Sequence, residues 1–334
     1  MNIEDYFIKE VYFENVKELF QELSPFGKYG SLLRGHVFRG ESSNSYQLIP
    51  SALREDKKIK LNALSNYTLT EEQFDIEFFQ QQSELHLLKK FYTLADERGI
   101  PTPDIPFMRN DVLNKFPSFL NGKISSKWIP DELLELATLA QHYGVPTRLI
   151  DWSLSHMTSL YFAASGALTK SEENKNEYMV LWALNYEHIE YLKDTTIRIP
   201  LRLIKPTYSR NPNILAQKGV LSCWEYENML TRLNYFQMPE VINTRINRAP
   251  LDQLLENYVL QNNINMVDSN SNYIVLLYKF YIPIKDAHTL YHALIKLNYG
   301  ADCIYAGLNG VYRRMDDDSK FDIEKIDSSQ IPFI

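Results

Sequence analysis

Residues 133–168 read LLELATLAQHYGVPTRLIDWSLSHMTSLYFAASGAL, and helix, turn and strand signals follow one another along this stretch. An apolar stripe of helical period runs until Gly144 and Pro146, which are common helix stop signals. Residues 147–152, TRLIDW, are too few for a helix and hold an apolar pair between charged residues, as a buried strand with polar ends does. The apolar spacing of residues 157–168 then predicts a second helix packed on that strand.

The composition indicates an ordinary globular chain with many aromatic rings. Hydrophobic residues make up 45% of the 334 positions and charged residues 23%, which are near the averages for folded domains. The 22 tyrosines and 17 phenylalanines predict a core built on rings. The length allows one large domain or two closely packed ones. The formal net charge of -7 argues against a uniformly basic nucleic-acid clamp but leaves a local basic groove open.

The cysteines and histidines show no clear metal-binding spacing. Cys223 and Cys303 are far apart, which predicts two buried free thiols and neither a zinc site nor a disulfide. His288 and His292 lie four residues apart, which a surface helix face explains better than a metal. Residues 1–9 contain acidic groups and no apolar run, and no apolar span of membrane length occurs. We therefore expect a cytoplasmic protein without a metal, a signal peptide or a membrane segment.

Further elements are predicted on both sides of this stretch. Residues 37–40, VFRG, form an apolar run that delivers Arg39 at the end of a strand, and Gly40 lets a ligand or another backbone come close. Thr70 and Gln73 form a capping box for a long helix. Strands are also predicted at residues 178–184, 214–221 and 273–282, and helices at residues 70–97 and 286–297. Because helices and strands mix without a regular βαβ repeat, an α+β fold is favoured over a doubly wound sheet.

The sequence contains none of the common catalytic motifs. The P-loop, the dinucleotide-binding glycine motif, the zinc-protease HExxH motif and the GxSxG nucleophile motif are all missing from it. What remains is a set of polar residues near predicted strand ends. These are Arg39, Gln141, His142, Thr147, Arg148, Asp151, Ser153, Gln217, Glu225 and Glu227.

A structural role competes with ligand contact at several of these positions. Arg148 and Asp151 are three residues apart and can pair with each other, and His142 can bond a free carbonyl at the helix end. Gln217 can satisfy buried backbone groups. For Arg39 the structural alternative is an ion pair at the edge of the core, but a strand-terminal Arg-Gly is also a simple way to build a phosphate site.

Several segments of the chain resemble the FRG domain family, which is named for its Phe-Arg-Gly motif. The segments are residues 38–40 (FRG), 141–153 (QHYGVPTRLIDWS), 160–163 (LYFA), 213–220 (NILAQKGV) and 307–310 (GLNG). On this resemblance we expect an FRG domain over residues 31–315 with a helical insertion around residues 70–130. A helical segment at residues 1–30 precedes it and a C-terminal tail at residues 316–334 follows it.

The FRG pattern is in turn similar to ADP-ribosyltransferases, and this likeness implies a mixed split sheet with a cleft that binds NAD. In such enzymes an arginine at the end of the first strand holds the NAD phosphates, a second strand carries a serine and a third supplies a glutamate. The likeness assigns Arg39 to the first role and Ser153 to the second. For the third it leaves Gln217, in the family's own motif, beside Glu225 and Glu227, which have the spacing of a bi-glutamate motif but can also both face solvent.

The same resemblance implies a set of site residues and partners. The implied catalytic residues are Arg39, Gln217, Glu225 and Glu227. The implied NAD-binding residues are Arg39, Gly40, His142, Thr147, Arg148, Asp151, Trp152 and Ser153. NAD would be the substrate, and RNA, DNA or protein the acceptor. The family likeness also suggests a toxin-like effector of antiviral defence that an antitoxin protein restrains.

Elementary chemistry is consistent with these roles. A guanidinium offers a fixed fork of donors that fits a pyrophosphate, and a carboxylate can steady the cationic centre that forms as nicotinamide leaves. Trp152 and Tyr161 could stack on a ring of NAD. This hypothesis requires Arg39 to lie in the same hollow as residues 147–152. The alternatives are a nucleotide hydrolase or a non-catalytic module that binds nucleic acid or a nucleotide through a basic rim, formed by Arg39, Arg148, Lys205 and Arg210.

Overall fold

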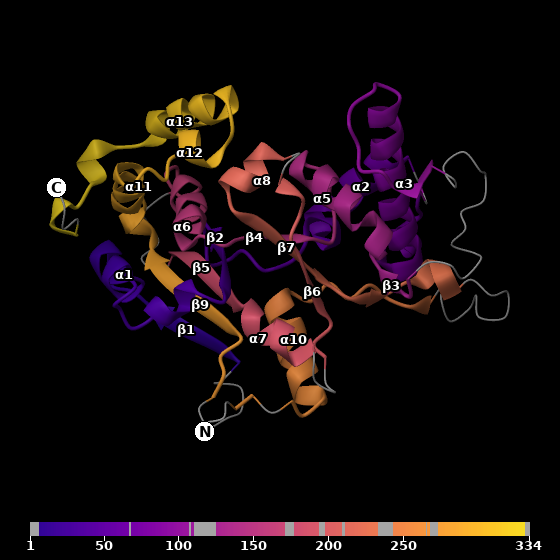
Figure 1. The fold of residues 1–334 in the computed structure, drawn as a ribbon, viewed down its shortest axis with the longest axis horizontal. Coiled ribbons are helices and arrows are strands. Elements are labelled where there is room, and N and C mark those ends of the chain that lie inside the picture. The colour runs from indigo at the N-terminus through magenta and orange to yellow at the C-terminus, as the bar shows by residue number, and fades with distance from the viewer. Residues whose placement is uncertain are drawn as a thin grey trace.

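A mixed sheet of seven strands lies at the centre of the chain (Figure 1). The computed structural model describes residues 7–66, 68–106, 108–109, 125–170, 177–193, 198–208, 211–232, 243–264, 266–267 and 273–330. The strands of the sheet are β1 (Ile8–Tyr12), β2 (His36–Glu41), β4 (Ile150–Ser153), β5 (Tyr178–Asn185), β6 (Leu201–Ile204), β7 (Gly219–Trp224) and β9 (Leu277–Pro283). Their order is β1-β9-β5-β2-β4-β7-β6. The β1–β9 pair is parallel and the other pairs are antiparallel.

Helices surround this sheet, and β3 (Lys127–Trp128) pairs with β8 (Tyr226–Glu227) in a separate small sheet. The helices are α1 (Val16–Glu22), α2 (Lys58–Ser65), α3 (Glu77–Asp96), α5 (Leu134–His142), α6 (His156–Ser165), α7 (Tyr186–Lys193), α8 (Pro212–Ala216), α10 (Leu251–Gln261), α11 (Ala287–Lys296), α12 (Ala301–Ile304) and α13 (Leu308–Lys320). Helices and strands are mixed along the chain, so the predicted α+β class is confirmed.

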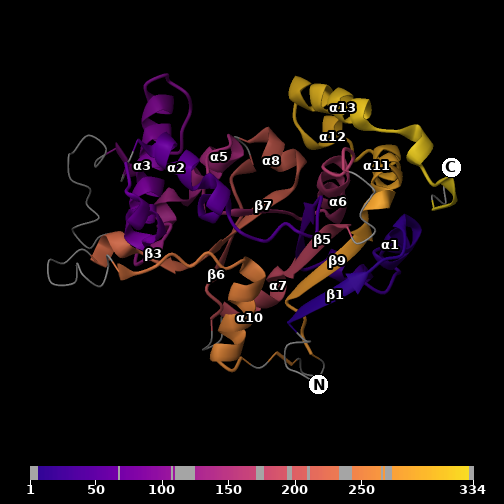
Figure 2. The ribbon, with the colours of Figure 1, turned by 180° about the vertical axis from the view of Figure 1, so that it is seen from behind.

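The central strand β5 is buried on both faces, which explains its continuous apolar run. Alternate side chains of a strand point to opposite faces of a sheet. Leu181 therefore joins the core under α1, α6 and α11, whereas Trp182 joins the core under α7 and α10. Figures 1 and 2 show these two helical layers on opposite sides of the sheet.

A third core lies at the end of the sheet that β7 and β6 form. It joins α3 and α5 to β3 and to the segment after β8. Figures 1 and 2 place α2 and α3 toward one end of the molecule, with α5 between α2 and α8, and place α1 and α11 toward the other end. The third core also contains Leu221 and Cys223 of β7, so the helical part at residues 77–96 and 134–142 packs against one face of this end of the sheet.

Most predicted elements are present, but the segment 214–221 is not the strand that its apolar residues suggested. Residues 212–216 form α8, because Asn211 accepts a hydrogen bond from the Ile214 amide and Pro212 occupies the first turn. β7 begins only at Gly219, so Gln217 follows a helix instead of ending a strand.

Two further expectations need correction. Cys223 is buried as predicted, but Cys303 is exposed, because it lies on the outer side of the short helix α12. The capping box at Thr70 is present, although it begins a 3-10 turn (Glu71–Asp75) and α3 starts only at Glu77. Within the predicted helical insertion around residues 70–130, residues 107 and 110–124 lie outside the described residues.

The seven strands form one sheet, but its two halves meet at a narrow junction between β2 and β4. Both strands are fully described, and the register between them consists of one pair, Phe38 opposite Ser153. On either side of this junction the pairing is extensive, since β2 pairs with β5 from His36 to Glu41 and β4 pairs with β7 from Ile150 to Ser153. The strands thus part immediately after Phe38, where Arg39 follows.

Candidate functional site

The Arg39 side chain spans the gap that opens between β2 and β4. Its Nη1 donates to the main-chain oxygen of Asp151 at 2.9 Å, and its Nε donates to Oε1 of Glu41 at 2.7 Å. The side chain is 20% exposed, so the guanidinium is part of a surface and not sealed in the core. Arg39 therefore lies in the same hollow as the TRLIDW segment, as the sequence hypothesis requires.

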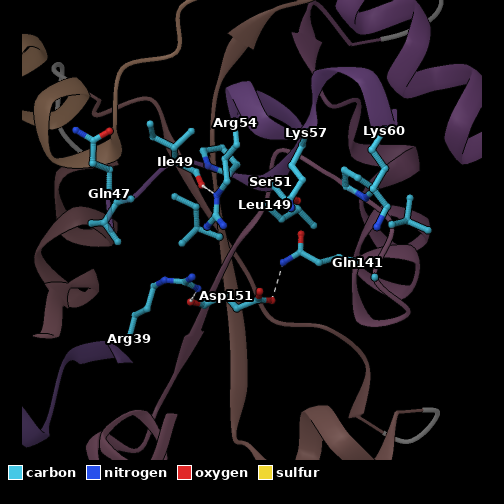
Figure 3. Close-up of a pocket in the computed structure, with 16 residues that line it drawn as sticks. Arg39, Gln47, Ile49, Ser51, Arg54, Lys57, Lys60, Gln141, Leu149 and Asp151 are labelled. Atoms are coloured by element: carbon cyan, nitrogen blue, oxygen red, sulfur yellow. Dashed lines mark hydrogen bonds between the residues drawn. The ribbon is translucent and has the colours of Figure 1, made fainter. Parts of the chain in front are cut away.

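A pocket of about 300 Å³ occupies this gap, and we call it the cationic pocket (Figure 3). It lies between the end of β2, the segment leading to α2, the C-terminal turn of α5 and the start of β4. Its lining residues are Arg39, Gln47, Leu48, Ile49, Pro50, Ser51, Arg54, Lys57, Lys60, Gln141, Gly144, Val145, Pro146, Leu149, Ile150 and Asp151. This volume is at the lower end of the range for small-molecule sites.

Positive charge dominates the wall of the cationic pocket. Four cationic side chains line it, from Arg39, Arg54, Lys57 and Lys60, and among its described lining residues the one carboxylate is that of Asp151. The Nε of Arg54 donates to the main-chain oxygen of Ile49 at 2.9 Å, and Figure 3 shows the side chain directed toward the space between Arg39 and Asp151. Converging guanidinium and ammonium groups favour an anionic ligand such as a phosphate.

A chain of hydrogen bonds holds the carboxylate of Asp151. The Nε2 of Gln141 donates to Asp151 Oδ1 at 2.6 Å, and the hydroxyl of Thr147 donates to the Oε1 of the same amide. Thr147 is itself buried, and its hydroxyl accepts from the Leu149 amide at 3.2 Å. Because the oxygen and the nitrogen of the Gln141 amide are both hydrogen-bonded, the orientation of this amide is fixed. The amide nitrogen is thereby directed at Oδ1 of Asp151.

Arg148 points away from this pocket into the third core. It is 1% exposed, with its Nε 2.9 Å from both carboxylate oxygens of Glu84 and its Nη1 2.8 Å from Oε1 of Glu77. The Tyr226 ring lies 4.6 Å from the guanidinium carbon. Desolvation by burial raises the pKa of Glu77. Arg148 thus anchors α3 to the segment before β4; it pairs with these glutamates and not with Asp151, and it does not line the cationic pocket.

The aromatic residues that the resemblance offered for stacking lie in the core. Trp152 is buried, and its Nε1 donates to Oγ of Ser222 at 2.8 Å. Tyr161 is buried in α6, and its hydroxyl donates to Asp317 at 2.6 Å. Neither ring lines the cationic pocket, because Trp152 alternates with Asp151 and so faces the other side of β4.

Gly40 and Ser153 have structural contacts at the junction of β2 and β4. A Cβ at Gly40 would stand 1.7 Å from the main-chain oxygen of Ser159, so glycine is needed here for the close approach of another backbone, α6, and not of a ligand. The hydroxyl of Ser153 donates to the main-chain oxygen of Gln217 at 2.7 Å and accepts from the Ser155 amide at 2.9 Å. Both residues thus hold the junction beside which Arg39 lies.

His142 and Gln217 lie beside α8 and outside the cationic pocket. The Nδ2 of Asn213 donates to Nε2 of His142 at 3.2 Å, and burial lowers the pKa of this imidazole, as suits an acceptor nitrogen. Asn213 also accepts from the Ala306 amide at 2.6 Å. His142 therefore links the end of α5 to α8 and the segment before α13, instead of bonding a free carbonyl of its own helix.

The two glutamates proposed as third catalytic element also lie elsewhere. Glu225 is ion-paired with Arg198 at 2.5 Å and with Lys127 at 2.8 Å. Glu227 is exposed at the end of β8, where its main-chain oxygen accepts from Gln81. The structure therefore brings Arg39 and Asp151 together and separates them from Glu225 and Glu227.

Sequence reasoning missed three of the four cations of the pocket. The candidate residues taken from the sequence included Arg39 but not Arg54, Lys57 and Lys60, which also line the cationic pocket. The sequence feature that could have revealed these cations is the basic run RxxKKxK from residue 54 to residue 60. Such a run is usually a solvated surface, and only its position opposite Arg39 distinguishes it.

The fold and site together define a class: an α+β domain with a pocket lined by cationic side chains at the parted edges of two antiparallel strands. In a comparison with protein families, residues 34–172 match the FRG domain, so this part of the chain is an FRG domain. The match contains all the residues that line the cationic pocket. The segments 213–220 and 307–310 lie outside it. No curated protein and no solved structure matches the chain. Within the described part of the chain, no helix is both long and apolar enough to cross a membrane.

Proposed function

We propose that the FRG domain binds NAD in the cationic pocket and transfers ADP-ribose to a macromolecule. The observation that carries the proposal is the position of Arg39 at the gap between β2 and β4, facing Asp151 within one pocket lined by three more cations. A pyrophosphate carries two negative charges, and the four cations of this wall outnumber the carboxylates of Glu41, Asp151 and Asp56, the last of which pairs with Lys57 at 2.9 Å.

The arginines differ in what they can offer a pyrophosphate. Arg39 uses its Nε and Nη1 on protein acceptors, which fixes the plane of the guanidinium and leaves Nη2 for a phosphate oxygen. Arg54 uses its Nε on Ile49, which leaves both of its terminal nitrogens for a bidentate contact. Lys57 and Lys60 add charge with less directional contacts.

In the proposed reaction, Asp151 is the carboxylate closest to the chemistry. The bond between the ribose C1′ and the nicotinamide nitrogen breaks, and its electron pair leaves with nicotinamide. The acceptor nucleophile bonds to C1′ and gives its proton to a carboxylate. Asp151 can stabilise the positive charge at C1′ and take this proton, because its carboxylate is exposed in the pocket and oriented by Gln141.

The biological setting is part of the proposal and rests on the family likeness alone. In it the chain is a cytoplasmic, toxin-like effector of antiviral defence that modifies RNA, DNA or protein, and an antitoxin protein restrains it. Of the predicted basic rim, Arg39 lines the cationic pocket, Arg148 is buried and Arg210 lies outside the described residues. Contact with a nucleic acid would therefore not depend on Arg148.

A second candidate is nucleotide recognition without transfer. It is favoured by one observation: neither Glu225 nor Glu227 lines the cationic pocket, so the glutamate that the likeness to transferases implies is missing from its described wall. On this alternative the pocket binds NAD or another nucleotide phosphate, and no bond is broken.

The test is to incubate the purified chain and a cell lysate with NAD labelled in its adenylate part. Nicotinamide release is measured together with the transfer of label to protein, RNA or DNA. We expect both in the wild type and neither in Arg39→Ala, with Arg34→Ala as a matched control on the exposed segment before β2. Binding of NAD without turnover would support the second candidate, and a chain that neither binds nor consumes NAD would contradict both.

A further inference from the structure

A second and larger pocket lies on the other side of the C-terminal turn of α5, and we call it the aromatic pocket. Its volume is about 920 Å³, and its walls come from the end of α3, residues 100–103, α5, residues 204–207 and α8. None of its lining residues is shared with the cationic pocket. The linings of the two pockets meet at neighbouring residues of the chain: Tyr143 lines the aromatic pocket, and Gly144 lines the cationic pocket.

The walls of the aromatic pocket carry rings and little net charge. Tyr143 is 70% exposed, and its ring centroid lies 6.5 Å from that of Phe91 at an interplanar angle of 30°. Among the described lining residues, Glu135 and Lys205 are the charged ones, and they have opposite signs. Glu135 accepts from the Thr207 hydroxyl at 3.1 Å, so part of its hydrogen-bonding capacity is already used. An uncharged ligand with a flat face fits such walls better than an anion does.

One polar group of this pocket has no partner. Thr138 lines the pocket and is 4% exposed, and its hydroxyl makes no hydrogen bond with any described residue. The hydroxyl oxygen has almost no accessible surface, so in this rotamer it is covered and does not face the open space of the pocket, and a buried hydroxyl without a partner costs free energy. Threonine in a helix has two accessible side-chain rotamers, and rotation about Cα–Cβ exchanges its methyl and hydroxyl groups.

We propose that the aromatic pocket is a binding site for an uncharged nucleobase, which stacks on Tyr143 and hydrogen-bonds through its edge to Thr138. A base has a flat face for the exposed Tyr143 ring and polar atoms along its edge, and rotation of the Thr138 side chain would give its unpaired hydroxyl one of these atoms as a partner. The inference concerns binding alone and does not depend on NAD binding in the cationic pocket.

The experiment uses the full chain and two probes that carry the same base: adenosine, which has no charge, and a short single-stranded oligodeoxyadenylate. Affinities are measured by titration calorimetry, and contact of the base with protein by saturation-transfer NMR. We expect adenosine to bind the wild type, about tenfold more weakly to Tyr143→Ala and about fivefold more weakly to Thr138→Val. Thr138→Val keeps the side-chain volume, so its effect reports the hydroxyl.

Two matched controls make the result decisive. Tyr312→Ala removes a tyrosine of similar exposure (68%) on α13 and should bind adenosine as the wild type does, and Arg54→Gln, which removes a cation of the cationic pocket, shows whether adenosine binds there instead. An oligonucleotide that binds more tightly than adenosine, and is weakened by the same two substitutions, would indicate a base within a polynucleotide as the natural ligand. Equal affinities would indicate a free nucleoside. No binding of either probe, or binding that only Arg54→Gln weakens, would overturn the proposal.

Discussion

The guanidinium of Arg39 donates to the main-chain oxygen of Asp151 across the gap between β2 and β4, at 2.9 Å. In a continuous antiparallel ladder that oxygen would face a main-chain amide. Here the strands part after the pair Phe38–Ser153, and a side chain closes the gap. A cation is thereby fixed at the mouth of the cationic pocket by the fold itself, before any ligand arrives.

We expect Arg39→Lys to lower the affinity for NAD by about tenfold or more, although the charge is kept. An ammonium cannot bond Glu41, Asp151 and a phosphate in one plane, so the directional contact is lost. The affinity is measured by titration calorimetry. Arg34→Lys serves as the control; an unchanged affinity in Arg39→Lys would show that Arg39 contributes charge only.

We expect Asp151→Asn to bind NAD with similar or higher affinity and to release nicotinamide at least about 100-fold more slowly, since the carboxylate is proposed to act in the transition state. The amide is of similar size and can still accept from Gln141. Single-turnover nicotinamide release separates this effect from binding. A loss of binding without a change in the rate at saturation would contradict the proposed role.

We expect Arg148→Met to destabilise the fold by about 3 kcal/mol or more, because it leaves Glu77 and Glu84 buried without their cation. Adding Glu84→Gln to this variant should recover part of the loss, since fewer uncompensated charges then remain. The free energy of unfolding is measured by urea titration. Lys320→Met, which breaks the exposed pair with Asp316, should cost less than about 1 kcal/mol.

We expect His36 to make the fold less stable as the pH falls. Burial lowers the pKa of His36 to about 4 in the folded chain, whereas the unfolded chain has the ordinary value near 6.5. The unfolded state therefore binds more protons between these values, and the stability that is present above pH 6.5 is lost as the pH falls toward 4. Between pH 7 and pH 5 this amounts to roughly 2 kcal/mol.

The measurement for His36 compares urea unfolding of the wild type and His36→Gln across this range. The variant cannot titrate there, so the difference in stability between the two proteins should shrink at lower pH. Burial also lowers the pKa of His156 to about 4, but His156 is present in both proteins, so its contribution cancels in the difference between their free energies of unfolding. A difference that does not change with pH would show that His36 is not the titrating group.

We expect Gly40→Ala to cost about 3 kcal/mol of stability and to weaken NAD binding, because its Cβ would displace α6 from β2 next to Arg39. Gly99→Ala is the matched control: it also adds a methyl group, at a positive φ but with open space around it, and should cost only about 1 kcal/mol. Equal costs at the two positions would mean that β2 and α6 can move apart easily.

Local signals in the sequence were sufficient for the elements around the site. The breakers Gly144 and Pro146 separate α5 from β4, and Ser155 caps α6 by accepting from the Thr158 amide. The Phe-Arg-Gly motif at residues 38–40 pointed to an FRG domain, which the family match over residues 34–172 confirms, and it singled out Arg39 as a candidate before any geometry was known. Such signals act between neighbouring residues or within about one helical turn, so they can be recognised from the order of residues in the sequence.

The partners of each charged side chain were decided by the tertiary structure alone. Arg148 and Asp151 are three residues apart, yet one is buried against Glu77 and Glu84 of α3 and the other is exposed in a pocket. Likewise, Arg54, Lys57 and Lys60 form a site only because the chain folds back to place them opposite Arg39. Burial and charge pairing depend on which segments distant in sequence pack together, and periodicity along the chain does not contain that information.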